Sequence, residues 1–290
     1  MIVVTLVGGI GNQMFEYAAA KTISELTNSE IVLNTKLGFK RDVCYRRVFC
    51  LDTLNVKYKN NRFLTFDFWG GRILEKVSKI LGIHLLAPQY RYIYDSVTIE
   101  EIKNHPFKYR NVILQGSWMD LGWVQFIKET LSADFSPSVL MPSVVQKYYG
   151  FISESKIPVV ALCVRIYQDV KDETLRQTVF FSTREIYYNT AIEYILNRCG
   201  KVHFLVFTQV KEWVEKNIDF HGMGHHYVQA STCDKDAIYD MSIISKCHHA
   251  IISNSSFYFW GAWMMKNDQS IVIIPKNWGK NLKCDNWVAI

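Results

Sequence analysis

The sequence of 290 residues lacks the features that would place it outside the globular enzymes. It has only six prolines and no long Gly/Ser or charge-block segment, which argues against disorder. Its longest apolar runs, such as residues 157–164, fall short of the ~20 residues that a membrane span requires, and the chain begins with a strand rather than a signal peptide. We therefore expect a soluble cytoplasmic enzyme without a transmembrane segment.

Spacings typical of disulfide frameworks and metal centres are also missing. The seven cysteines contain no Cys-x-x-Cys pair, which favours reduced thiols over a disulfide framework or a zinc site. Adjacent histidines at 225–226 and 248–249 point to opposite faces of a strand and rarely ligate one ion together. The run Asp234-Lys235-Asp236 has the form of a metal-binding Asp-x-Asp, but it precedes a helix and equally fits an N-cap region. We expect no metal.

The charge balance narrows the class of partner. A net charge of +6 is modest, and no basic stripe interleaves with the aromatic residues as in a single-strand groove. This pattern disfavours a nucleic-acid partner. It suits an anionic small molecule, or peripheral contact with an anionic membrane surface.

What the sequence does contain is an alternation of strands and helices in both halves. The second half predicts strands at 159–164, 203–207, 226–228, 250–252 and 270–274, with helices of about ten residues between them. The first half predicts strands at 2–7, 31–34 and 111–114, and helical patterns after residue 13 and near 72–81. We predict an α/β protein of two Rossmann-like domains facing a cleft, an acceptor-side domain at 1–150 and a nucleotide-sugar-binding domain at 151–290.

The first candidate site is the glycine-rich turn after the first strand. Gly8, Gly9 and Gly11 stand between this strand and a helix, which presents backbone N–H groups and the positive end of a helix dipole to a phosphate or a sugar hydroxyl. The amides of Asn12 and Gln13 add donors and acceptors at its mouth. A purely structural tight turn remains the alternative.

A nicotinamide or flavin dinucleotide fold is the rival interpretation of this turn. That fold needs a third glycine and an acidic residue about 20 positions later. Here the third position is Met14, and the next strand ends at Asn34. Both residues disfavour an oxidoreductase.

Two further candidates follow strands of the second half. Arg165 leaves the strand 159–164, where it could grip a pair of phosphate oxygens or be a solvated loop arginine. The apolar strand 250–252 ends in four small polar residues, Ser253 to Ser256, before an aromatic-rich helix. Four such residues are more than an N-cap needs, which favours contact with a ligand.

The chain resembles the bacterial α-1,2-fucosyltransferases of glycosyltransferase family 11. The residues that carry the resemblance are Gly8–Ala18, Phe207–Gln209 with Glu212 and Trp213, Asp240–Cys247, Ser253–Phe257 and Trp260–Trp263. The resemblance covers nearly the whole chain. Its N-terminal and Ser-Asn-Ser-Ser-Phe motifs are the specific ones.

The resemblance implies a two-domain GT-B arrangement and an inverting, metal-independent transfer of fucose from GDP-fucose to a glycan hydroxyl, usually O-2 of a terminal galactose. No cofactor is implied, and the acceptor would be a glycan or a lipid-linked oligosaccharide. Members carry a His-x-Arg-Arg-x-Asp motif, of which only Arg165 is retained within residues 163–168. Either Arg176 or Arg184 compensates for the lost charge, or donor choice and activity are altered.

These considerations give each candidate a predicted role. Arg165 and Asn12 are the predicted catalytic residues, because a metal-free transferase must stabilise its leaving diphosphate with cations, helix N-termini and polar groups. Trp118, Asp120 and Trp123 are predicted acceptor contacts, although core packing is the alternative for these tryptophans. Asp169 and Glu16 are candidates for the general base, and neither is assigned. The predicted donor-binding residues are Gly9, Gly11, Gln13, Thr208, Gln209, Asp240, Ser253, Asn254, Ser255, Ser256 and Phe257.

Two alternatives to fucosyl transfer stay open. A related transferase could use another nucleotide sugar, because the arginine motif is degraded. An inactive relative could keep the fold and bind GDP without turnover.

Overall fold

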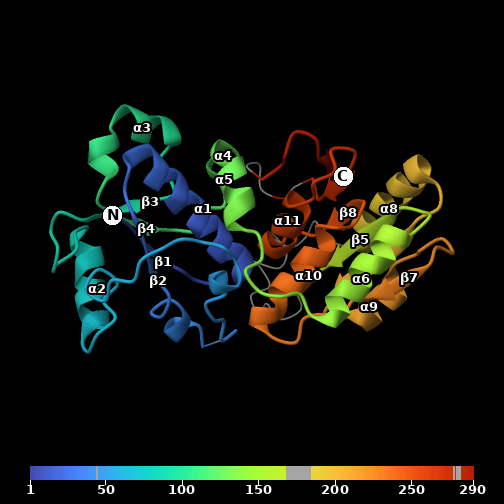
Figure 1. The fold of residues 1–290 in the computed structure, drawn as a ribbon, viewed down its shortest axis with the longest axis horizontal. Coiled ribbons are helices and arrows are strands. Elements are labelled where there is room, and N and C mark those ends of the chain that lie inside the picture. Colours follow the sequence, from blue (N-terminus) through green and yellow to red (C-terminus); the bar gives the residue numbers. More distant parts are fainter. Residues whose placement is uncertain (44, 168–183, 277, 279–281) are drawn as a thin grey trace. The chain divides into compact units, whose positions relative to one another are not determined.

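The computed structural model describes residues 1–43, 45–167, 184–276, 278 and 282–290. The chain divides into two compact units, Met1–Val139 and Leu140–Ile290 (Figure 1). The division lies eleven residues before the expected one at 150/151. The reason is that helix α6 (Ser143–Glu154) packs on α10 of the C-terminal unit.

The N-terminal unit is built on a four-stranded parallel sheet in the order β2-β1-β4-β3. Its strands consist largely of Val, Ile and Leu that are buried on both faces, as expected for a parallel sheet covered by helices. The sequence predicted three of these strands and missed β3, whose four residues Arg-Tyr-Ile-Tyr contain a single β-branched side chain. The strands are β1 (Ile2–Thr5), β2 (Ile31–Asn34), β3 (Arg91–Tyr94) and β4 (Val112–Gln115).

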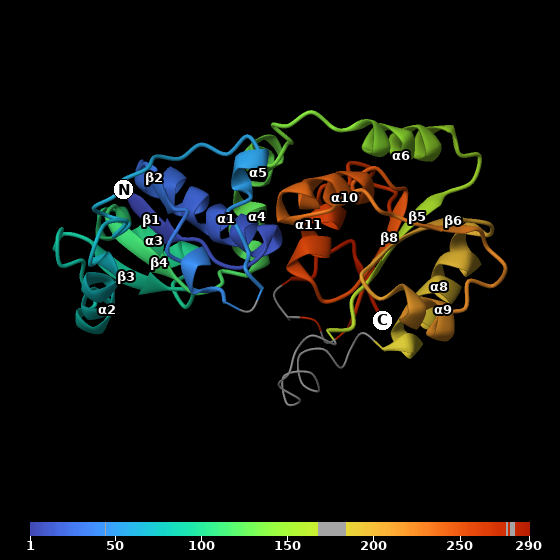
Figure 2. The same ribbon diagram turned by 90° about the horizontal axis from the view of Figure 1, so that it is seen from below.

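Helix α1 (Ile10–Thr27) is the central helix of this unit. Its run Ala18-Ala19-Ala20 is fully buried, and the small side chains let the helix approach the sheet and α4 closely. Helix α2 lies beside the edge strand β3 (Figures 1 and 2). The other helices of the unit are α2 (Gly71–Leu81), α3 (Ile99–Asn104), α4 (Leu121–Phe126) and α5 (Lys128–Asp134).

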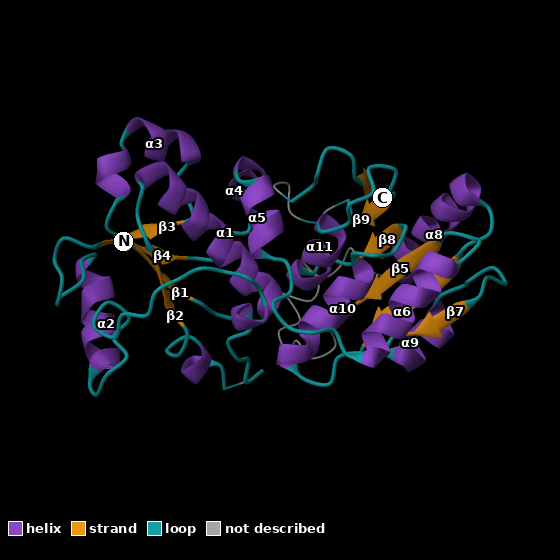
Figure 3. Ribbon diagram, in the orientation of Figure 1, coloured by secondary structure: helices purple, strands orange, loops and turns teal. Residues whose placement is uncertain are grey.

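The C-terminal unit contains a six-stranded parallel sheet in the order β10-β9-β8-β5-β6-β7 (Figure 3). Numbered by their appearance in this unit and followed from β7 to β10, the strands have the order 3-2-1-4-5-6 of a dinucleotide-binding sheet. The strand order therefore reverses between the parallel neighbours β5 and β8, and ligands of such sheets bind beyond the carboxyl ends of the strands near that point. The strands are β5 (Val159–Val164), β6 (His203–Thr208), β7 (His225–Tyr227), β8 (His249–Ile252), β9 (Val272–Ile274) and β10 (Val288–Ala289).

The helices predicted for the second half are all present among the described residues. They are α8 (Glu185–Cys199), α9 (Lys211–Asn217), α10 (Ala237–Ile244) and α11 (Ser256–Trp263), and each differs from its prediction by at most a few residues at either end. Helix α8 ends at Gly200, whose φ of 67° is unfavourable for residues with a Cβ. The strong periodicity of the second half therefore sufficed to place these helices and strands β5 to β9, whereas the two-residue strand β10 was not predicted.

Candidate functional site

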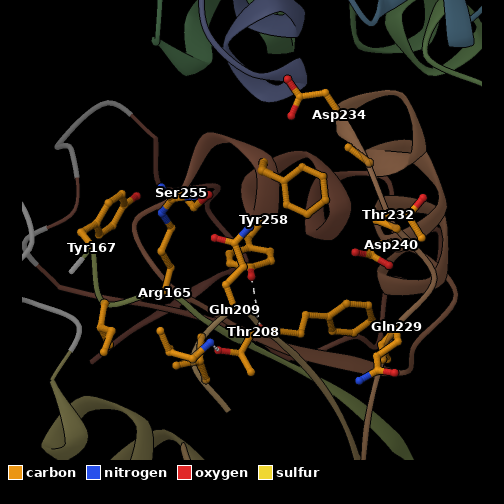
Figure 4. A pocket seen from close by; sticks show the side chains of 18 of the residues that line it. Arg165, Tyr167, Thr208, Gln209, Gln229, Thr232, Asp234, Asp240, Ser255 and Tyr258 are labelled. Carbon is orange, nitrogen blue, oxygen red and sulfur yellow. Dashed lines mark hydrogen bonds between the residues drawn. The ribbon is translucent and has the colours of Figure 1, made fainter. Parts of the chain in front are cut away.

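A pocket of about 930 Å³ opens at the carboxyl edge of the C-terminal sheet (Figure 4). The residues that follow β5, β6, β7 and β8 all contribute to it, so the pocket lies where the strand order predicts a ligand. The side chains and backbone that line it are Val164–Tyr167, Phe207–Val210, Val228, Gln229, Ser231–Asp234, Ala237, Asp240, Ser255, Phe257 and Tyr258.

Arg165 is the cationic residue that lines this pocket. Its backbone N–H donates to the hydroxyl of Tyr188 on α8 at 3.2 Å, and its guanidinium carbon lies 4.5 Å from the centre of the Tyr167 ring. The hydroxyl of Tyr167 in turn donates to the carbonyl of Asn254 at 2.5 Å. Tyr188 thus holds the backbone of Arg165, and the ring of Tyr167 holds its guanidinium. These contacts order the long side chain before any ligand binds.

Asp240 on α10 supplies the pocket with a partly buried carboxylate. Burial raises its pKa above the ordinary value, while hydrogen bonds from Ser231 and from the backbone of Ala230 oppose the shift. Its Oδ1 atom is buried and has no hydrogen-bond partner among the residues that the structure describes. A buried acceptor of this kind is costly unless a ligand donates to it.

The remaining polar wall combines loop residues with the start of α11. Ser255 is the N-cap residue of α11, and Tyr258 in its first turn donates to the carbonyl of Phe207 at the end of β6 over 3.1 Å. Asp236 accepts from the backbone N–H and the hydroxyl of Thr232, which fixes the loop after β7 and lowers the pKa of Asp236. Asp236 therefore holds the loop, and its neighbour Asp234 lines the pocket.

The structure brings together six of the residues predicted for catalysis and donor binding. These are Arg165, Thr208, Gln209, Asp240, Ser255 and Phe257. Ser253 and Asn254 are buried below the turn, and neither these two nor Ser256 is among the residues that line the pocket. Gly9, Gly11, Asn12 and Gln13 belong to the N-terminal unit.

Gln13 has a structural role in the N-terminal unit. Its side chain is fully buried, and its Nε2 donates to the carbonyls of Gly8 at 2.9 Å and of Val48 at 2.8 Å. Its Oε1 accepts from the N–H of Cys50 at 2.9 Å. The amide therefore joins the glycine turn to a segment 35 residues later, and Asn12 beside it is half-buried.

Glu16 and the predicted acceptor residues are also held by the N-terminal unit itself. Glu16 is buried, accepts from the N–H of Val7 at 3.0 Å, and burial raises its pKa well above the ordinary value. Trp118 and Trp123 are buried and pack edge to face at 5.4 Å, while Asp120 caps α4 by accepting from the N–H of Gly122. The expected stacking on a sugar therefore finds no exposed indole face here.

Three further residues named from the sequence are not among the described residues that line the pocket. Asp169 and Arg176 lie outside the described residues. Arg184, the N-cap residue of α8, is exposed and is not among the residues that line the pocket.

Sequence reasoning missed several residues of the pocket. Tyr167, Gln229, Ser231, Thr232 and Tyr258 all line it, yet none was singled out. Three of them could have been found from their position, because Gln229, Ser231 and Thr232 follow β7. Residues that follow parallel strands gather at one edge of the sheet. The short, half-polar β7 gave that position little prominence.

Comparison with known sequences agrees with this geometry. Residues 167–287 match the model of glycosyl transferase family 11. The chain is 26% identical to the O-antigen biosynthesis glycosyltransferase WbnK of Escherichia coli, with 98% of this chain and 99% of the relative covered. It is also 26% identical to an α-1,2-colitosyltransferase of the same organism, with 96% and 92% covered. The chain is a glycosyltransferase with sequence similarity to family 11.

This glycosyltransferase also shares its fold with a solved structure. It superposes on a mutant of Arabidopsis thaliana FUT1 in complex with GDP with a TM-score of 0.56 at 14% identity, covering 95% of this chain and 70% of that one. This likeness, together with the parallel sheets of both units, confirms the predicted GT-B class of α/β fold. Among the described residues, no helix has the length and apolar character that a membrane span needs.

Proposed function

We propose that this protein is a family 11 glycosyltransferase that transfers fucose from GDP-fucose to a hydroxyl of a glycan, with inversion and without a metal. The observation that carries the proposal is the pairing, within one pocket, of a fixed guanidinium at Arg165 with the buried acceptor oxygen of Asp240. A nucleoside diphosphate sugar has the complementary groups, an anionic diphosphate and a base that donates hydrogen bonds.

Asp240 supplies a physical reason for guanine. The N1–H and the exocyclic amino group of guanine are adjacent donors, which a carboxylate can accept together. Adenine places an acceptor nitrogen where guanine has N1–H, so its lone pair would face the carboxylate. Two donors would also stabilise the ionised form of Asp240, whose pKa burial raises. A site built this way rejects the base that leaves its buried oxygen unpaired.

Arg165 supplies the charge stabilisation that the reaction requires. The acceptor hydroxyl attacks the anomeric carbon from the face opposite the diphosphate, its oxygen forms the new glycosidic bond, and the bond to the β-phosphate oxygen breaks with its electron pair. GDP leaves with added negative charge, which a guanidinium and the N–H groups at the start of α11 can stabilise. The hydroxyl proton passes to a base that is not assigned. Asn12 remains a predicted contact at the sugar end.

The test is a donor panel with product analysis. Purified protein is incubated with GDP-fucose or ADP-fucose and a set of β-galactosides, with and without EDTA, and the linkage of the product is determined. We expect transfer from GDP-fucose that EDTA leaves unchanged, and we expect Asp240→Asn to lower the preference for the guanine donor at least tenfold. Transfer that requires a divalent ion, or an Asp240→Asn enzyme with unchanged base preference, would contradict the proposal.

A second donor is supported by a specific observation. A relative that matches 96% of this chain is an α-1,2-colitosyltransferase, and colitose is the 3-deoxy analogue of fucose. The retention of only Arg165 from the arginine motif also fits an altered donor. GDP-colitose therefore belongs in the panel, and a higher kcat/KM with it than with GDP-fucose would replace fucose as the donor sugar. Binding of GDP without any transfer would instead identify an inactive relative.

A further inference from the structure

Helix α2 exposes most of its apolar side chains and buries two of its polar ones. Ile73, Ile80 and Leu81 are 70%, 84% and 56% exposed, whereas Glu75 and Ser78 are buried. At 3.6 residues per turn, the exposed apolar positions Ile73, Val77, Ile80 and Leu81 fall within about 100° of the helix circumference. Surface helices of globular proteins normally turn such a stripe toward the core.

Specific bonds fix this orientation. The carboxylate of Glu75 forms ion pairs with Arg41 and, at 3.2 Å, with Lys79. The hydroxyl of Ser78 accepts from the N–H of Leu85 at 3.0 Å. Turning the helix to bury its isoleucines would break the bonds to Arg41 and Leu85 and expose Glu75, so these bonds hold the apolar stripe outward.

The surroundings of the stripe combine an aromatic residue with basic charge. Trp69, two residues before the helix, is 99% exposed. Arg72 and Lys76 are exposed and, by helical spacing, lie along one side of the stripe. We call Trp69, Arg72, Ile73, Lys76, Ile80 and Leu81 the α2 face. Exposed isoleucine and tryptophan flanked by Arg and Lys are the composition of helices that lie in the interface of an anionic bilayer.

We propose that the α2 face docks the enzyme on an anionic lipid membrane. The apolar side chains enter the headgroup region, and Arg72 and Lys76 contact lipid phosphates. The charge argues against a second copy of the chain, because a symmetric contact through this face would bring Arg72 and Lys76 toward the same residues of the other copy. The proposal concerns a surface of the N-terminal unit and does not depend on the donor sugar.

The test measures partition of the full chain onto vesicles by co-sedimentation. Vesicles of phosphatidylcholine alone are compared with vesicles containing about 30% phosphatidylglycerol, an anionic-lipid content chosen to give a negative surface. We expect binding to the anionic vesicles that weakens with salt. The variant Ile73→Ser/Ile80→Ser should lower the partition coefficient roughly tenfold or more, because two apolar anchors are lost. The variant Arg72→Gln/Lys76→Gln should lower it ~30-fold on anionic vesicles only.

Matched controls lie on the other unit. Leu140 is 95% exposed, and Lys147 and Lys156 are exposed, so Leu140→Ser and Lys147→Gln/Lys156→Gln should leave partition unchanged. All variants should melt like the wild type and retain turnover of a soluble acceptor, which separates this test from that of the proposed function. Absence of vesicle binding by the wild type, or equal binding by the α2-face variants, would overturn the proposal. So would a dimer in light scattering that Ile73→Ser/Ile80→Ser dissociates while no vesicle binding occurs.

Discussion

A Cβ atom added at Gly261 of α11 would lie 2.9 Å from Cγ2 of Ile244 on α10. The same two helices carry the pocket residues Tyr258 and Asp240. Gly261 lies inside a regular helix, so its backbone conformation does not require glycine. A small residue is required here because the side chain of Ile244 leaves no room for a Cβ atom.

Gly261→Ala should therefore destabilise the protein by about 1–3 kcal/mol through overpacking. Combining it with Ile244→Ala should recover part of the loss, since the new methyl then fills space that Ile244 vacates. Urea denaturation of the two single variants and the double variant measures this coupling. Gly150→Ala on α6 is the control, because a Cβ there meets only the flexible end of Glu154 at 4.0 Å. Strict additivity would show that the contact is not tight.

Arg165→Ala should lower kcat/KM by ~10² to 10³, the effect of removing one charged group that stabilises the leaving diphosphate. The melting temperature should change little. Arg198→Ala is the matched control, because Arg198 makes a similar contact with the ring of Tyr194 at 4.6 Å on the exposed side of α8. Steady-state kinetics with GDP-fucose checks the prediction. A loss of less than threefold would remove Arg165 from the mechanism.

Tyr167→Phe should separate the two contacts of this residue. The ring that faces Arg165 is kept, while the hydrogen bond to the carbonyl of Asn254 is lost. We expect a decrease in the free energy of unfolding of about 1 kcal/mol with a small change in kcat, and a larger fall in activity for Tyr167→Leu, which removes the ring as well. Equal activity of both variants would show that the ring does not position the arginine.

Gln13→Leu should lower the free energy of unfolding by about 3 kcal/mol, because the N–H of Cys50 and two carbonyls lose a buried partner. Chemical denaturation followed by tryptophan fluorescence provides the measurement. The control Gln125→Leu, at an exposed position of α4, should change the free energy of unfolding by at most ~0.5 kcal/mol. A Gln13→Leu protein that is fully stable but inactive would instead favour a direct role in binding.

His203 should make stability depend on pH. Its Nε2 lies 2.6 Å from Nδ1 of His226, and burial, followed by the charges of His226 and His225, lowers its pKa in the folded state. The unfolded chain therefore binds more protons as pH falls through the ordinary histidine range near 6.5, and stability is lost in that direction. Thermal melts between pH 7.5 and pH 5.5, a range chosen to span that value, should show a smaller decline for His203→Phe than for wild type. The exposed control His105→Gln should decline like wild type.

The periodic pattern of the sequence by itself determined the α/β class, the elements of the second half except β10, and the strand ends that carry Arg165 and Ser255. Apolar β-branched runs and their spacing suffice for this, because they act locally along the chain. The number of residues between elements also predicted parallel pairing and hence a shared edge.

Only the tertiary structure decided which of the candidate residues line the pocket and which serve the fold. Gln13, Trp118 and Asp120 carry the same chemistry as binding residues, yet their hydrogen bonds and packing lie within the protein. The sequence also could not predict that the apolar stripe of α2 faces solvent, because a helical pattern shows that a stripe exists but not whether it faces the core or the solvent. That direction depends on Arg41 and Leu85, and contacts between residues distant in sequence are set by packing rather than by local pattern.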